Sequence, residues 1–162
     1  MEAVLAGLFA IGGTLLGSLV TYLFQQRTAQ RAEQFTISAR LREERMAVYS
    51  GFAGTVLEFR SAQYNRALLR FEGRESAAYD EAKATSYRLR AASWHSLYRV
   101  RLLADDPEIT RLAENAMTLV ADMHDSTERA ALTQRGDAVR EAVEEFITAA
   151  SAEVTRAKPL PR

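Results

Sequence analysis

An uncharged apolar run near the N-terminus, Ala3 to Phe24, constrains this chain more than any other feature. Its twenty-two residues include no charged side chain, and Gln25, Gln26 and Arg27 follow it directly. As an α-helix that rises 1.5 Å per residue, the run is roughly 33 Å long, and the hydrocarbon core of a bilayer is about 30 Å thick. The sequence therefore predicts a transmembrane helix over residues 3–24, which tethers the rest of the chain to a membrane.

Two other interpretations of this run are a cleaved signal peptide and a buried core helix. A signal peptide begins with a basic segment, has a shorter apolar core and ends in small residues. Here Glu2 is the only charged side chain before the run, and Tyr22, Leu23 and Phe24 close it. We therefore favour an uncleaved anchor.

The distribution of arginine predicts how the anchor is oriented. No Lys or Arg precedes the run, whereas a group of arginines follows it. Because positively charged flanks stay in the cytoplasm, we expect a single-pass protein of the cell (cytoplasmic) membrane, with its N-terminus outside and its bulk in the cytoplasm. The arginines of this flank are Arg27, Arg31, Arg40, Arg42 and Arg45.

Small side chains recur along one face of the run at intervals of three and four residues. Helices in lipid associate by close backbone approach at such residues, and Gly13 and Gly17 form a GxxxG pattern. The pattern favours a self-associating helix and hence a homo-oligomer, although a seam that faces lipid has the same spacing. The residues of this association face are Ala6, Ala10, Gly13, Gly17 and Thr21.

The remainder of the chain has the composition of an all-α protein. It contains three prolines, is rich in Ala, Leu, Glu and Arg, and shows no strand-like alternation. We expect the anchor to continue into a cytoplasmic antiparallel bundle of three or four helices. The expected parts are a transmembrane helix at 3–24, a juxtamembrane stalk at 25–40, a bundle at 41–157 with helices at about 41–71, 75–104, 107–124 and 137–156, and a tail at 158–162. The heptad-like spacing of the juxtamembrane segment favours a coiled-coil stalk, and a solvated linker is the alternative.

Local signals place the ends of these helices. Gly73 can take the left-handed backbone conformation that often ends a helix. Asp106 is a suitable N-cap, and Pro107 suits the first helical position. We expect further breaks at residues 125–127 and 134–137.

Each expected bundle helix carries an apolar stripe wide enough to face a core. The heptad-like seam of the stalk continues into the first of these helices as far as Tyr49. The expected core residues are Leu41, Val48, Phe52, Val56, Phe59 and Leu69, then Ala82, Leu89, Ser93, Leu97, Val100 and Leu103, then Ile109, Leu112, Ala116, Leu119, Val120 and Met123, and finally Val139, Val143, Phe146, Ile147, Ala150 and Val154.

No pattern in the chain indicates a chemical site. There is no cysteine, which excludes disulfides and thiolate metal sites, and there are two histidines. A di-iron bundle needs Glu-x-x-His pairs, but Ala92 and Ala121 stand three residues before His95 and His124. No glycine-rich phosphate loop and no nucleophile motif is present either. We therefore predict a non-enzymatic protein without catalytic, cofactor-binding or metal-binding residues.

Arginine and aromatic side chains are interleaved over residues 87–101. Arg88 and Arg99 are eleven residues, or three helical turns, apart and therefore share a face, as do Arg90 and Arg101. The cluster is interpreted as a solvated face whose arginine stems cover aromatic edges, as a docking surface for an acidic partner helix, or as a contact with anionic lipid headgroups. The candidate partner-binding residues are Arg88, Arg90, Trp94, Arg99 and Arg101.

Charge gives two further indications about this cluster. The chain holds 21 basic and 21 acidic side chains, a balance that argues against a nucleic-acid partner. A helix near the C-terminus is acidic, so that its carboxylates offer the arginines a partner inside the bundle. The carboxylates are Glu141, Glu144, Glu145 and Glu153.

The first quarter of the chain is similar to a known type of protein. The run from Ile11 to Gly17, which contains GTLLG, and the following Thr21, Gln25 and Gln26 resemble the N-terminal segment of small actinobacterial membrane proteins of the KilB family. The similarity covers about the first 45 residues. It implies a membrane-associated factor in the spread of conjugative plasmids between hyphae, and it brings no catalytic residue with it.

Two hypotheses about function follow. The first is a membrane-anchored scaffold or adaptor that acts at the cytoplasmic face through self-association or through an unidentified protein partner. The second is a membrane-tethered sensor that binds a small ligand within its helical bundle. The isolated polar residues that suit such a ligand site are Ser93, His95 and Asn115.

Overall fold

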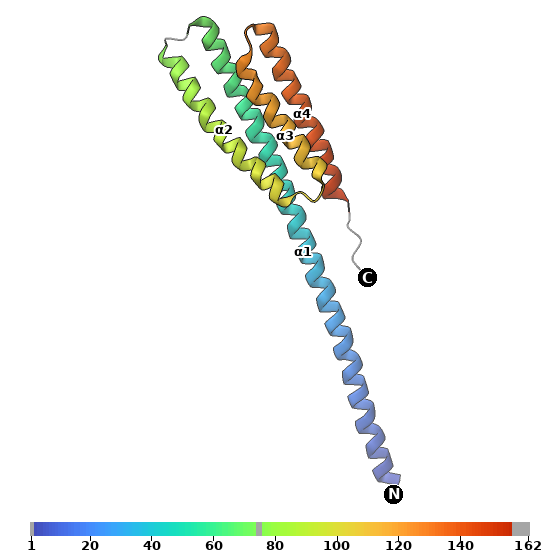
Figure 1. The fold of residues 1–162 in the computed structure, drawn as a ribbon. Helices are drawn as coiled ribbons and strands as arrows, with labels where there is room; N and C mark the ends of the chain where they lie inside the picture. The colour runs from blue at the N-terminus through green and yellow to red at the C-terminus, as the bar shows by residue number, and fades with distance from the viewer. Residues whose placement is uncertain (1, 74–75, 157–162) are drawn as a thin grey trace. The chain divides into compact units, whose positions relative to one another are not determined.

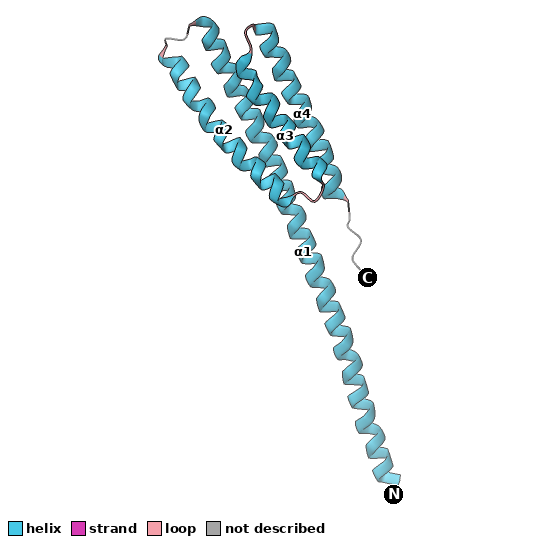
Figure 2. Ribbon diagram, viewed as in Figure 1, coloured by secondary structure: helices cyan, strands magenta, loops and turns pink. Residues whose placement is uncertain are grey.

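The computed structural model describes residues 2–73 and 76–156, and within residues 2–35 it describes the side chain of Tyr22 only. The described chain is all-α, as predicted (Figure 2). By its internal contacts it divides into two units, Met1–Arg42 and Glu43–Arg162. The helices are α1 (Glu2–Glu72), α2 (Ala77–Leu103), α3 (Pro107–Asp122) and α4 (Arg129–Thr155), and a short 3-10 helix, η1 (Met123–Asp125), follows α3.

The first unit contributes the N-terminal part of α1, whose backbone is helical from Glu2 onward. Within the described part of the chain, no helix is both long enough and apolar enough to cross a membrane. The side chains that carry the predicted span at 3–24, apart from Tyr22, lie outside the described residues. So do those of the association face, Ala6, Ala10, Gly13, Gly17 and Thr21. The transmembrane helix and its association face therefore stay predictions.

The second unit packs as a four-helix bundle. The sequence predicted either three or four helices, and the structure has four in this unit. The C-terminal part of α1 forms the bundle together with α2, α3 and α4, and consecutive helices run in opposite directions (Figure 1). Within this unit α2 and α4 are the two outer helices in the view of Figure 1, on either side of α1 and α3. Short connections between consecutive helices favour this antiparallel arrangement.

The core of the bundle consists mainly of the predicted apolar stripes. Phe52 and Phe146 meet at its centre with their ring centroids 4.9 Å apart, and the ring of Tyr49 approaches that of Phe146 edge-on at 5.9 Å. Two predicted core residues are exposed instead, Leu41 by 38% and Ile147 by 39%. Leu41 belongs to the first unit, outside the bundle. Ile147 is exposed because the neighbouring Phe146 takes the inward position, and adjacent helical residues point about 100° apart.

The predicted ends of the first three bundle helices are confirmed. The helix α1 ends at Glu72, and Gly73 follows with a φ of +144°, which a residue with a side chain rarely adopts. Asp106 caps α3, because its side chain accepts a hydrogen bond from the N–H of Glu108, and Pro107 is the first residue of that helix. These ends are set by local chemistry, which is visible in the sequence.

The predicted start of the last helix, at about residue 137, is wrong. The helix α4 begins at Arg129 and passes through Gly136, where we expected a break. A glycine inside a helix costs about 1 kcal/mol relative to alanine. Here it provides room for Arg60 of α1, whose Nε donates to the carbonyl of Gly136 and whose Nη2 would lie 3.1 Å from an added Cβ. The glycine permits a close contact between two helices.

A buried carboxylate, Glu153 near the end of α4, ties three parts of the bundle together. Its oxygens accept a hydrogen bond from the hydroxyl of Tyr49 at 3.1 Å and pair with Arg45 of α1 at 3.2 Å. They also accept from the backbone N–H groups of Asp105 and Asp106, each at 3.4 Å, in the connection between α2 and α3. The side chain is 8% exposed, so these donors replace the water that the charge has lost.

The predicted pairing of the acidic last helix with the arginines of α2 is therefore corrected. Glu153 pairs with Arg45 of α1, and Arg101 of α2 pairs with Glu114 of α3 at 2.5 Å. Among the described residues, α2 and α4 make no contact with each other. The sequence showed that the charges are complementary but not that the two helices lie on different sides of the bundle.

Two buried polar contacts fix the rotation of α2 against the rest of the bundle. The hydroxyl of Ser86 donates to the side-chain carbonyl of Gln63 at 2.8 Å, and that of Ser93 donates to the backbone carbonyl of Thr55 at 3.0 Å. Ser86 and Ser93 are seven residues, or about two turns, apart and therefore lie on the same side of the helix. Because this side faces α1, the opposite side of α2 faces outward.

The buried tyrosine gives a test of the Glu153 contacts. Burial and the adjacent Glu153 carboxylate raise the pKa of Tyr49 well above its ordinary value. The stabilisation that follows is complete below the unfolded pKa of about 10 and is lost as the pH rises toward the folded value. We expect the free energy of unfolding, measured with urea between pH 8 and 11, to fall above pH 10 by up to about 1.4 kcal/mol per pH unit more than in Tyr49→Phe.

A matched control for this experiment is Tyr87→Phe, because Tyr87 is 51% exposed. It should keep the pH dependence of the wild-type chain. An equal slope above pH 10 in the wild type and in Tyr49→Phe would contradict the role that we assign to the buried hydroxyl.

Candidate interaction surface

The outward side of α2 carries a row of large exposed side chains. Tyr87, Trp94, Tyr98 and Leu102 are exposed by 51%, 38%, 50% and 88%, respectively. Their separations of seven, four and four residues place them along one stripe of a helix. The rings of Trp94 and Tyr98 lie next to each other, with centroids 5.9 Å apart. We call this row, together with the arginines beside it, the α2 face.

The α2 face is also basic. Residues 82–103 contain five basic side chains and no acidic one. Arg88, Arg90 and Arg99 are exposed, and among the described residues no ion pair is recorded for them. Arg101 bonds Glu114 and lies 5.9 Å from the centre of the Tyr98 ring, the geometry of a cation–π contact. The five predicted partner-binding residues therefore all lie on exposed parts of α2, and Arg101 alone is paired.

The composition of the α2 face is that of a binding surface. Tyrosine, tryptophan and arginine are the residues that contribute most to protein–protein affinity when they are covered. Here the aromatic side chains occupy one side of a rigid helix, with Arg90 and Arg101 along one edge and Arg88 and Arg99 along the other, so that little backbone freedom is lost on binding. Leu102 was missed by the sequence analysis, although its spacing from Tyr98 could have revealed it.

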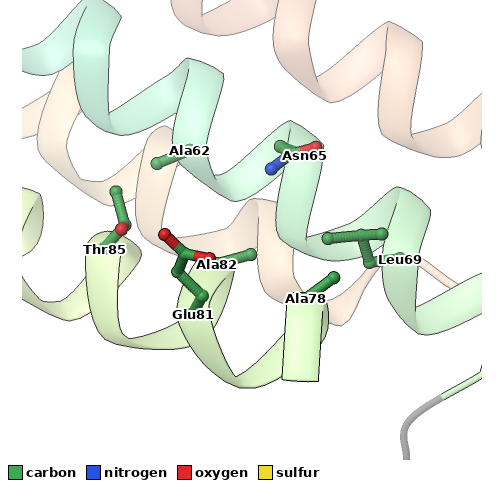
Figure 3. Close-up of a pocket in the computed structure, with 7 residues that line it drawn as sticks. All are labelled: Ala62, Asn65, Leu69, Ala78, Glu81, Ala82 and Thr85. Carbon is green, nitrogen blue, oxygen red and sulfur yellow. The ribbon is translucent and has the colours of Figure 1, made fainter. Parts of the chain in front are cut away.

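A groove also runs along the seam between α1 and α2. One part has a volume of about 260 Å³ and is lined by residues of both helices, three alanines together with Asn65, Leu69, Glu81 and Thr85 (Figure 3). A second, wider part of about 610 Å³ shares Asn65 and Thr85 with the first and reaches Arg88 at the edge of the α2 face. Sequence analysis missed the groove, because it forms where small residues of two separate helices meet, Ala62 from α1 and Ala78 and Ala82 from α2.

The structure does not bring together the three polar residues that we considered for a ligand site. Ser93 is buried, and its hydroxyl donates to the backbone carbonyls of Thr55 and Leu89. His95 and Asn115 are exposed, on α2 and α3. None of the three lines either part of the groove.

The acidic and histidine side chains offer no metal site in the described part of the chain. No group of three or more of them is placed to hold a metal ion there. His124 and Asp125 lie 3.0 Å apart and are both more than half exposed. The backbone carbonyl of Ala121 lies 2.6 Å from the Nδ1 atom of His124, which is the environment of a surface helix end.

A comparison with protein-family models found the family described as KilB plasmid transfer protein, over residues 46–154. This range is most of the bundle and contains the whole α2 face. The resemblance described above depended on the first 45 residues, so the two similarities lie in different parts of the chain. No curated protein and no solved structure matched the chain.

The single tryptophan, Trp94, reports on the electrostatic potential of the α2 face. Arg90 lies one turn before it, and Arg101 lies on the same side two turns after it. We expect iodide, an anion, to quench the fluorescence of Trp94 at least about twofold more efficiently than caesium, because the unpaired Arg90 attracts anions. The measurement is a quenching titration with both ions at matched ionic strength.

The arginine dependence of this effect can be checked with two variants. Arg90→Gln should reduce quenching by iodide, whereas Arg156→Gln, which removes an exposed arginine just after α4, should leave it unchanged. Equal quenching by iodide and caesium in the wild type would show that the face carries no net positive potential.

Proposed function

The chain belongs to the KilB plasmid transfer protein family, and from that premise we propose that it serves plasmid spread as a membrane-anchored adaptor that binds protein and catalyses no reaction. The observation that carries this proposal is the α2 face, a row of exposed aromatic side chains among unpaired arginines. A soluble surface rarely leaves such residues uncovered on one helix unless a partner covers them.

The proposed location is the cell membrane, with the N-terminus outside and the bundle in the cytoplasm. Two features of the sequence support it, the uncharged run at 3–24 and the arginines that follow it. In this arrangement the bundle is held at the cytoplasmic surface, where it meets partners that lie along the membrane. The predicted small-residue face of the span would add self-association within the bilayer.

A second candidate function is a sensor that binds a small ligand. The groove between α1 and α2 favours it, because Asn65, Thr85 and Arg88 place polar groups along a mostly apolar seam. A ligand there would contact both helices and could change their spacing. The adaptor remains our first proposal, because the groove is open to solvent and shallow while the α2 face extends over four helical turns.

Plasmid transfer itself tests the adaptor. We expect the double variant Arg90→Glu and Arg99→Glu to reduce the frequency of plasmid transfer by about tenfold or more, because each substitution replaces attraction by repulsion at the α2 face. The control is Arg156→Glu, which reverses one arginine charge outside this face and should leave transfer unchanged. Immunoblots should show equal amounts of all three proteins. Unchanged transfer in the double variant would contradict the proposal.

Membrane topology can be tested because the chain contains no cysteine, so that any introduced cysteine is the only one. We expect a membrane-impermeant maleimide to label Glu2→Cys in intact cells and to label Ser151→Cys, an exposed position on α4, only after lysis. The protein should stay in the membrane pellet after extraction with alkaline carbonate. Release by carbonate would contradict the anchor, and the opposite labelling pattern would contradict the orientation.

A further inference from the structure

The bundle carries a second charged face, on α4, of opposite sign to the α2 face. Residues 137–153 contain five acidic side chains and one basic one. Glu153 is buried, while Asp137, Glu141, Glu144 and Glu145 are exposed. We call these four carboxylates, together with Ile147, the α4 face.

The carboxylates of the α4 face differ in how far they are already neutralised. The Oδ1 atom of Asp137 lies 3.9 Å from the Nη2 atom of Arg60 and 3.5 Å from the Nη2 atom of Arg140. Within the described chain, no ion pair is recorded for the side chains of Glu141 and Glu144. These two are three residues apart and share one side of the helix, with Ile147, which is 39% exposed, one turn further on. The face thus combines unpaired negative charge with an apolar contact point.

The two faces cannot satisfy each other within one chain. The helices α2 and α4 make no contact with each other among the described residues, and they lie on either side of the other two bundle helices (Figure 1). Both helices are 27 residues long, about 40 Å each, so that α2 of one chain and α4 of another can lie side by side along their lengths. The α2 face and the α4 face can meet when they belong to two different copies of the chain.

We propose that the α2 face of one copy of this chain docks against the α4 face of a second copy. Arg88, Arg90 and Arg99 would then meet Glu141 and Glu144, and the aromatic row would cover Ile147. Because the contact uses two different surfaces, a docked pair still offers one free α2 face and one free α4 face, and the assembly grows head to tail.

Attachment to a membrane would favour this assembly. A shared anchor confines all copies to one surface, which raises their effective concentration and removes part of the entropy cost of association. The inference rests on the proposed function only in taking the α2 face as a binding surface. It adds the identity of the partner, a second copy, and the position of the complementary surface on α4.

The test exchanges charges on the purified full-length chain in detergent. Two variants are compared with a common parent. All three proteins carry Gly13→Ile and Gly17→Ile, so that the predicted span contributes no association. The first variant adds Arg90→Glu and Arg99→Glu and therefore sets two glutamates of α2 opposite the carboxylates of the α4 face. The second adds Glu141→Arg and Glu144→Arg and therefore sets two arginines of α4 opposite those of the α2 face. Their common parent keeps both natural faces, and mass is measured by light scattering over a range of concentrations.

We expect the parent to form assemblies that grow with concentration and dissociate in high salt. Each variant alone should need at least about tenfold more protein to reach the same mass, because its faces repel. Mixing the two variants in equal amounts should restore assembly, since the new glutamates on α2 of one variant then meet the new arginines on α4 of the other, and the natural pair of faces also forms. Restoration also shows that both variants are folded.

A parent that stays monomeric, or a mixture that does not regain assembly, would overturn the proposal. The result of this light-scattering test is independent of the result of the plasmid-transfer test of the proposed function. If Arg90→Glu and Arg99→Glu abolish plasmid transfer while the parent is monomeric at every concentration, the α2 face binds another protein, and only the inference about a second copy fails.

Discussion

The bundle depends on one buried carboxylate. Glu153 pairs with Arg45 of α1 and accepts hydrogen bonds from Tyr49 of α1 and from two backbone N–H groups of the α2–α3 connection. Removing one partner of such a group costs about 3–5 kcal/mol, because an uncompensated charge is left out of water. The contact therefore fixes the end of α4 against α1 and holds the connection from which α3 starts.

The same arrangement determines what the outer helices present. Ser86 and Ser93 bind Gln63 and the backbone of α1, so that Trp94 and its neighbours on α2 face solvent. On the other outer helix, Phe146 enters the core, and Glu144 and Ile147 are therefore exposed. Two faces of opposite charge thus result from how each helix is rotated in the bundle.

Much of the fold and part of the surface could be predicted from the sequence. Gly73, Asp106 and Pro107 act on their own neighbours, and helix ends of this kind can be found without knowing the fold. The arginines and Trp94 were identified because their spacing is that of a helix face. The start of α4 was missed, because Gly136 favours a break locally, whereas the contact that it permits is with Arg60, which is distant in sequence. The groove was missed for the same reason.

The sequence by itself determined that the chain is helical, where most of its helices begin and end, and which side chains carry charge, because these properties depend on residues within a few positions of one another. Only the tertiary structure decided which helices are neighbours. In the folded bundle Glu153 pairs with Arg45 and not with the arginines of α2, and α2 and α4 make no contact among the described residues. The physical reason is that burial and pairing depend on contacts between residues far apart in the chain, and local spacing does not encode these contacts.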